Sequence, residues 1–218
     1  MRRKTTLPAD GLTGRARRAR VEPMAVRPLR DGRYVVETDG GTYVVDIETR
    51  TCTCPDNAIR HARCKHLRRV AIEITTGEVP PPGRRTATCA VCGDKTFVPM
   101  DARGPQLCRT HEHHPGDLVH DRETGSLLVV TRALHTRADE TTTEPGRLVS
   151  EFETNTEYGD HEPVFEAVYL GSLPATVGLS GLSGLEGVRT YRFPASRLSR
   201  VEQGFVGSRS LGDQLVRA

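Results

Sequence analysis

The sequence has no tryptophan, few aromatic residues and no long apolar run. Aromatic residues make up 5% and hydrophobic residues 36% of the 218 positions, so each hydrophobic core must be small. No run of eighteen apolar residues is present, which argues against a transmembrane helix. The first residues lead into arginines instead of the apolar core of a signal peptide. We therefore expect a cytoplasmic protein that has no membrane partner.

Lysine is also scarce, and the charge is unevenly spread. Only Lys4, Lys65 and Lys95 are lysines among the 31 basic residues. The formal net charge is +3, yet residues 1–30 carry nine basic and two acidic residues, and residues 115–218 carry ten basic and fifteen acidic residues. The first segment therefore suits a polyanion such as DNA, whereas the last segment would repel one.

The motifs of common enzyme classes are missing. The sequence has no Gly-x-x-x-x-Gly-Lys phosphate loop and no Gly-x-Ser-x-Gly nucleophile elbow. Each of the six cysteines has a metal-ligand neighbour, which leaves no cysteine as a nucleophile. Four acidic residues near expected strand ends are more typical of solvated turns than of a metal-nuclease cluster. They are Asp117, Asp121, Asp139 and Glu140. We expect a binding protein and not an enzyme.

Two short motifs, Cys52-Thr53-Cys54 and Cys64-Lys65-His66, lie nine residues apart. Structural zinc takes four thiolate or imidazole ligands, which these motifs supply. The one-residue spacing within each pair is tighter than in common DNA-reading fingers. The alternative is a set of buried cysteines without a metal, but four ligand residues at this spacing favour zinc.

The segments around these motifs have the patterns of a β-hairpin and an amphipathic helix. Residues 33–37 and 42–47 are alternating runs, and the Asp-Gly-Gly sequence at 39–41 is a typical hairpin turn. From residue 62 to about residue 75, apolar residues recur at helical spacing. They are Leu67, Val70, Ala71 and Ile74.

From about residue 31 to residue 76, the chain resembles the SWIM zinc finger family, whose motif is Cys-x-Cys, a spacer and Cys-x-His. The resemblance implies that one zinc ion is held by Cys52, Cys54, Cys64 and His66. Members of the family include chromatin-remodelling ATPases, transposase-like factors, ubiquitin ligases and recombination accessory proteins, in which the finger is assigned to DNA or protein binding. The resemblance therefore implies a DNA-binding or protein-binding module.

A second candidate zinc site combines the Cys-x-x-Cys pair Cys89 and Cys92 with Cys108, which follows after fifteen residues, and His111. This spacing fits a zinc ribbon or a treble-clef-like knuckle. His113 or His114 is the alternative fourth ligand, and a loop without metal is the alternative to the site as a whole. Four protein ligands leave zinc no open position for a substrate, so we expect two zinc ions, both structural.

We predict an α+β fold of small zinc-stabilised domains followed by a mainly β domain. The predicted parts are a basic arm at 1–30, the finger at 31–77, a proline-rich linker at 78–86, the second zinc knuckle at 87–114 and the β domain at 115–218. Strands are expected in the last domain at 126–131, 147–152, 164–170 and 188–193, with a loop in the Gly/Ser/Leu-rich tract at 178–187. This domain is similar to uncharacterised haloarchaeal proteins that also carry a SWIM finger.

The basic residues of the first half are candidates for contacts with nucleic-acid phosphates. They are Arg15, Arg17, Arg18 and Arg20 in the arm, and Arg63, Lys65, Arg68 and Arg69 beside the first zinc site. The alternative is a disordered solubilising tail and an ordinary solvated helix face. A protein–protein adaptor is the second functional hypothesis, with the acidic last domain as the docking surface for a protein partner. The two hypotheses are compatible on one chain.

Overall fold

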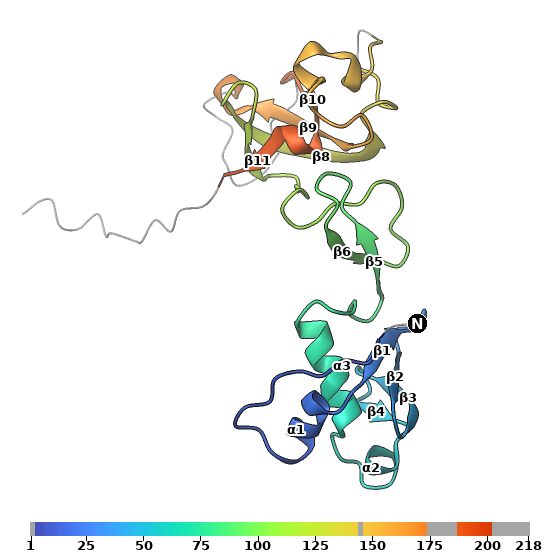
Figure 1. Ribbon diagram of the computed structural model, residues 1–218. Helices are drawn as coiled ribbons and strands as arrows, with labels where there is room; N and C mark the ends of the chain where they lie inside the picture. The colour runs from blue at the N-terminus through green and yellow to red at the C-terminus, as the bar shows by residue number, and fades with distance from the viewer. Residues whose placement is uncertain (1–2, 144–145, 174–186, 202–218) are drawn as a thin grey trace, which may run out of the picture. The chain divides into compact units, whose positions relative to one another are not determined.

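The computed structural model describes residues 3–143, 146–173 and 187–201 (Figure 1). The chain divides into two compact units. The first contains the chain up to Thr88 together with Asp94–Arg103, and the second contains Cys89–Gly93 and the chain from Gly104 onward. Within the described ranges, no helix is long and apolar enough to span a membrane. The Gly/Ser/Leu-rich tract lies outside the described residues except for Gly187.

The first unit is built on a four-stranded antiparallel sheet with the order β1-β2-β3-β4. Its strands are β1 (Ala25–Pro28), β2 (Tyr34–Thr38), β3 (Gly41–Asp46) and β4 (Thr51–Cys52). Its helices are α1 (Gly14–Val21), α2 (Pro55–Ala58) and α3 (Lys65–Thr75). The predicted hairpin is confirmed, and Gly41 takes a φ of 135° directly after its turn, a value that favours glycine.

The core of the first unit lies between this sheet and one face of α3. Val36 and Val45 of the sheet and Leu67 and Val70 of the helix are buried in one cluster. The apolar residues recur at i and i+3 along α3, so one helical stripe covers the sheet. Met24, which precedes β1, belongs to the same core, so the amino-terminal segment is part of this fold.

A second hairpin in the first unit consists of β5 (Arg84–Thr88) and β6 (Lys95–Pro99). The proline-rich sequence predicts a linker at residues 78–86, but β5 begins within this range at Arg84. The strands of this hairpin are mostly exposed or half-buried, so they lack the clear alternation of apolar and polar residues that marks a strand against a core.

The second unit is a five-stranded antiparallel sheet with the order β10-β9-β8-β7-β11. The strands are β7 (Leu118–Asp121), β8 (Leu127–Arg137), β9 (Pro163–Tyr169), β10 (Tyr191–Pro194) and β11 (Leu198–Arg200). Their apolar side chains form one core, in which Val119, Leu128, Phe165 and Phe193 are buried. The predicted α+β class, with a mainly β carboxy-terminal region, is confirmed.

The expected strand at 147–152 is wrong. The chain there forms two 3-10 turns, η1 (Val149–Glu151) and η2 (Glu153–Asn155). Side chains form hydrogen bonds with nearby backbone groups. The Glu151 carboxylate accepts from the Leu148 backbone amide at 2.9 Å, and the Asn155 side-chain amide donates to the Val149 carbonyl at 2.7 Å. Such local hydrogen bonds compete with sheet pairing and favour turns.

Candidate metal centres

The first cluster of metal-ligand residues is held by the ends of three elements. Cys52 ends β4, Cys54 precedes α2, Cys64 caps the amino terminus of α3, and His66 lies in the first turn of α3. All four are buried, and their ligand atoms lie within 4.8 Å of one another. The His66 Nδ1 atom is 3.7 Å from the sulfur of Cys52 and 3.9 Å from that of Cys64.

These distances fit one tetrahedral zinc ion. Zinc–sulfur bonds of about 2.3 Å place neighbouring ligand atoms about 3.8 Å apart in a tetrahedron. The nitrogen of His66 that faces the sulfurs is Nδ1. The structure therefore offers a closed Cys3His set, in which His66 binds through Nδ1.

The ionisation of the thiols in the first cluster also fits a bound cation. The hydrogen bond from Cys52 is the main reason why the pKa of Cys64 falls to about 3, with further lowering by His66 and the Leu67 amide. The same hydrogen bond, together with burial, raises the pKa of Cys52. Without a cation, the thiolate of Cys64 therefore needs a protonated neighbour. A dication removes this conflict because it binds all three sulfurs as thiolates.

Two residues that the sequence analysis did not identify support the first cluster. The Cys52 amide donates to Asn57 Oδ1 at 2.7 Å, and Asn57 Nδ2 donates to the Ala62 carbonyl at 2.9 Å, so Asn57 connects the two ligand pairs. The ring of Tyr43 stacks on His66 with centroids 4.2 Å apart. Supporting contacts of this kind fix ligand orientation. A polar residue beside Cys-x-Cys was the only signal available for Asn57.

The second cluster contains Cys89, Cys92, Cys108 and His111, whose ligand atoms also lie within 4.8 Å of one another. His111 Nδ1 is 3.6 Å from the sulfur of Cys89 and 3.2 Å from that of Cys108, and the sulfurs of Cys92 and Cys108 are 3.8 Å apart. Burial of Cys89 by itself would raise its pKa, but backbone amides of Cys92 and Cys108, among others, lower it to about 6. A ready thiolate in a Cys3His set fits zinc.

The histidine that lies in the second cluster is His111, the residue favoured from the sequence. His113 is buried and packs edge-on against Phe165, with ring centroids 5.2 Å apart. Burial is the main reason that the pKa of His113 falls to about 4. His114 is exposed and lies 3.9 Å from a carboxylate oxygen of Asp117. His113 is thus a core residue of the second unit.

The second cluster is built into the carboxy-terminal sheet unit. The Ala90 amide donates to the Gln106 carbonyl at 2.7 Å, and His161 Nε2 lies 2.9 Å from the Ala90 carbonyl. Val91 and Leu107 pack against the core of the five-stranded sheet. The four residues of the second cluster therefore belong to the same unit as the five-stranded sheet, whereas residues 94–103, within the predicted knuckle, belong to the first unit.

Three of the candidate phosphate contacts are neutralised by carboxylates. Arg15 forms two hydrogen bonds of 2.7 Å with Asp56 and holds the pKa of that carboxyl at about 2. Lys65 pairs with Glu22. Arg69 is fully buried and lies 2.7 Å from Glu73. The prediction that Arg69 contacts nucleic acid is therefore corrected, because no phosphate can reach an enclosed guanidinium.

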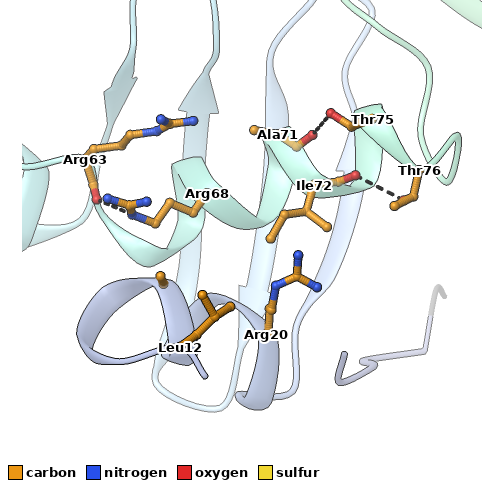
Figure 2. Close-up of a pocket in the computed structure, with 9 residues that line it drawn as sticks. Leu12, Arg20, Arg63, Arg68, Ala71, Ile72, Thr75 and Thr76 are labelled. Atoms are coloured by element: carbon orange, nitrogen blue, oxygen red, sulfur yellow. Dashed lines mark hydrogen bonds between the residues drawn. The ribbon is translucent and has the colours of Figure 1, made fainter. Parts of the chain in front are cut away.

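The other five candidates lie on α1 and at or beside α3. Arg17 and Arg18 are exposed, whereas Arg20, Arg63 and Arg68 line a hollow of about 410 Å³ between the two helices. Figure 2 shows Arg63 and Arg68 at one end of this hollow, and Leu12 and Arg20 on its α1 side. The remaining lining residues are Ala16, Ala71, Ile72, Thr75 and Thr76. The lining thus combines an apolar floor with arginines and contains no carboxylate.

Comparison with known protein families matches residues 37–74 to the SWIM zinc finger. This segment contains all four ligands of the first cluster. Neither the curated proteins nor the solved structures gave a match to the chain. The family match and the two Cys3His clusters together show a zinc-binding protein with sites for two zinc ions. The second cluster and the five-stranded sheet lie outside the matched segment.

Proposed function

We propose that the chain is a DNA-associated binding module in which zinc is purely structural and the α1–α3 face of the first unit contacts phosphates. The observation that carries the proposal is a group of five arginines on α1 and at or beside α3, of which Arg20, Arg63 and Arg68 line the hollow. They are Arg17, Arg18, Arg20, Arg63 and Arg68. Among the described residues, none of the five forms an ion pair, whereas neighbouring Arg15, Lys65 and Arg69 do.

Arginine suits this role because its planar guanidinium binds phosphate oxygens in a bidentate manner. Each phosphate that is neutralised releases condensed counterions, so affinity falls steeply with salt. The hollow presents arginines and no carboxylate, which avoids repulsion of an approaching phosphate. Few aromatic residues are available to stack on bases, so the proposed contact is largely independent of DNA sequence.

The zinc ions would support DNA binding indirectly, because they stabilise the fold that positions the arginines. The first centre fixes the start of α3, because Cys64 caps this helix and His66 lies in its first turn. α3 in turn carries Arg68 and packs against α1. Four protein ligands close each centre, so neither ion has a position for substrate. We therefore extend the proposal to a non-catalytic role for both.

The test is fluorescence anisotropy of labelled single-stranded and duplex DNA against the zinc-loaded chain at several salt concentrations. Deleting residues 1–30 would be a poor variant, because Met24 and β1 belong to the sheet unit. The sharper variant is Arg17→Gln with Arg18→Gln, since both side chains are exposed. The matched control with the same loss of charge is Arg30→Gln with Arg122→Gln, which are exposed elsewhere.

The proposal expects salt-sensitive binding that the Arg17/Arg18 variant weakens and the control leaves nearly unchanged. Each lost phosphate contact should reduce the slope of log Kd against log salt by about 0.9 on duplex DNA. Equal weakening by both variants would indicate general charge attraction only. No binding at low salt would reject the DNA function.

A protein–protein adaptor is the second candidate function. The floor of the α1–α3 hollow is apolar, with Leu12, Ala16, Ala71 and Ile72, which a DNA backbone does not require. The segment 115–218 adds net negative charge, which a basic partner would favour. If DNA binding fails, Ile72→Ser should leave the fold intact and weaken any partner that buries an apolar side chain in the hollow.

A further inference from the structure

The two metal centres differ in their exposure to solvent. In the first, Cys52, Cys54 and Cys64 are at most 5% exposed. In the second, Cys92 is exposed and Cys108 is half-buried, although Cys89 is buried. Oxidants of low molecular mass reach exposed sulfurs far more readily than enclosed ones, and thiolates react faster than thiols. The two centres therefore differ in their access to peroxide.

We propose that the second centre is an oxidation site, at which hydrogen peroxide joins Cys92 and Cys108 in a disulfide and releases the zinc ion. The first centre keeps its zinc under the same conditions. The inference depends only on the second centre, so it holds or fails independently of the proposed DNA binding.

The geometry favours this pair of sulfurs. The sulfurs of Cys92 and Cys108 are 3.8 Å apart, and a disulfide bond of about 2.05 Å needs only a small local movement. Cys92 lies in a turn followed by Gly93, which has a φ of 75° and whose amide donates to the Cys89 carbonyl at 3.0 Å. Cys89 is buried, so peroxide reaches its sulfur less readily than that of Cys92. The Cys92–Cys108 pair is therefore expected to react before Cys89.

The chemistry balances with one molecule of hydrogen peroxide. The Cys92 thiolate attacks one peroxide oxygen and forms a sulfenic acid, while the other oxygen leaves as hydroxide. The Cys108 thiolate then attacks the sulfenic sulfur and displaces a second hydroxide as the disulfide forms. The two sulfurs lose two electrons, and both hydroxides take up protons to give two water molecules. Only Cys89 and His111 remain as ligands, which is too few to retain structural zinc.

The release of this zinc has a structural consequence within the second unit. The cluster holds the segments that place Val91 and Leu107 on the core of the five-stranded sheet. Oxidation should therefore loosen this edge of the unit, and reduction in the presence of zinc should restore it. The first unit provides an internal reference.

The experiment uses the full chain loaded with two zinc ions and exposed to hydrogen peroxide. Zinc content is followed by native mass spectrometry, and disulfides are mapped by peptide analysis after thiol alkylation. We expect one zinc to leave at least about tenfold faster than the other, together with a Cys92–Cys108 disulfide that a reductant reverses. Equal rates at both centres, or a disulfide that involves Cys89 first, would overturn the proposal.

The control variant is Cys92→His, which keeps four possible zinc ligands but removes one sulfur of the reacting pair. Its second zinc should resist peroxide at least about tenfold better than that of the unmodified chain. If the variant fails to bind a second zinc, the rates and the disulfide map of the unmodified chain still decide the question. Unchanged peroxide sensitivity in a variant that retains both zinc ions would contradict the proposed pair.

Discussion

The Arg69 guanidinium on α3 donates a hydrogen bond of 2.9 Å to the carbonyl oxygen of Thr5, which lies 64 residues earlier in the chain. The same side chain donates to the Met24 carbonyl at 3.3 Å and pairs with Glu73 at 2.7 Å. The buried Arg69 thus connects the amino-terminal segment to α3, the helix whose amino-terminal end supplies two zinc ligands. The segment expected to be a separate basic arm is part of the finger unit.

Replacement of Arg69 by alanine should therefore be strongly destabilising. The change removes the ion pair between Arg69 and the buried Glu73 carboxylate, which costs about 3–5 kcal/mol. Urea unfolding of the zinc-loaded chain measures the loss, and hydrogen exchange should show that residues near Thr5 and Met24 open first. The adjacent Arg68→Ala is the control, with an expected change within about 0.5 kcal/mol because its side chain is half-exposed. A similar loss of stability in both variants would argue against a stabilising role for the contacts of Arg69 with the amino-terminal segment.

Asn57 should control the zinc affinity of the first centre although it is not a ligand. Asn57→Ala removes the acceptor for the Cys52 amide and the donor to the Ala62 carbonyl. Loss of such a supporting contact typically lowers metal affinity 10- to 100-fold, so roughly that range is expected here. Competition with a chromophoric chelator measures both zinc ions, and the second centre should be unaffected. An unchanged first centre would show that the ligands are oriented without Asn57.

Removal of one ligand from one centre at a time should destabilise the unit that contains this centre and leave the other unit folded. Cys54→Ala should eliminate one zinc equivalent and unfold the first unit, because structural zinc contributes on the order of 10 kcal/mol to folding in small sites. Cys89→Ala should eliminate the other equivalent and loosen the sheet unit against whose core Val91 and Leu107 pack. Native mass spectrometry counts the zinc, and hydrogen exchange locates the loss. If either variant lost both zinc ions, the prediction that the two centres bind zinc independently would be wrong.

The sequence predicted the metal ligands well because zinc restricts both residue type and spacing. The hairpin turn and the apolar stripe of α3 were equally local signals, and both are confirmed. Contacts between residues that are far apart in the sequence could not be predicted from such local patterns. Whether Arg69 contacts phosphate or Thr5 depends on how α3 packs, and no local pattern shows this. Likewise, Val91 and Leu107 are single apolar residues beside zinc ligands, so their packing on a distant sheet left no periodic signal.

Asp121 is the clearest case of a residue whose environment the sequence concealed. It was expected to be a solvated turn residue, but it is fully buried and pairs with Arg197, which lies 76 residues later. Two hydrogen bonds of 2.8 and 2.9 Å join the carboxylate to the Arg197 guanidinium. Burial acts to raise the pKa of Asp121, yet hydrogen bonds from Arg197, the Glu123 amide and Thr124 outweigh it and lower the pKa.

The stability of the second unit should therefore depend on the ionisation of Asp121. Because its pKa is lower in the folded state, its contribution is present above the unfolded pKa of about 3.9 and is lost as the pH falls through the lower folded pKa. At pH 7, Asp121→Asn should cost about 3–5 kcal/mol, since Arg197 stays buried without a carboxylate partner. The exposed Glu157→Gln is the matched control, with an expected change within about 0.5 kcal/mol.

The measurement is urea unfolding of the unmodified chain and the Asp121→Asn variant between neutral pH and pH 3. Acid also weakens zinc binding, but it does so in both proteins, so the difference between them isolates the carboxylate. The difference in unfolding free energy between the two proteins should be constant above about pH 5. It should become smaller below about pH 4, where Asp121 begins to take up a proton in the unfolded state of the unmodified chain. A difference that stays constant to pH 3 would mean that the amide substitution acts through packing and not through the loss of the ion pair with Arg197.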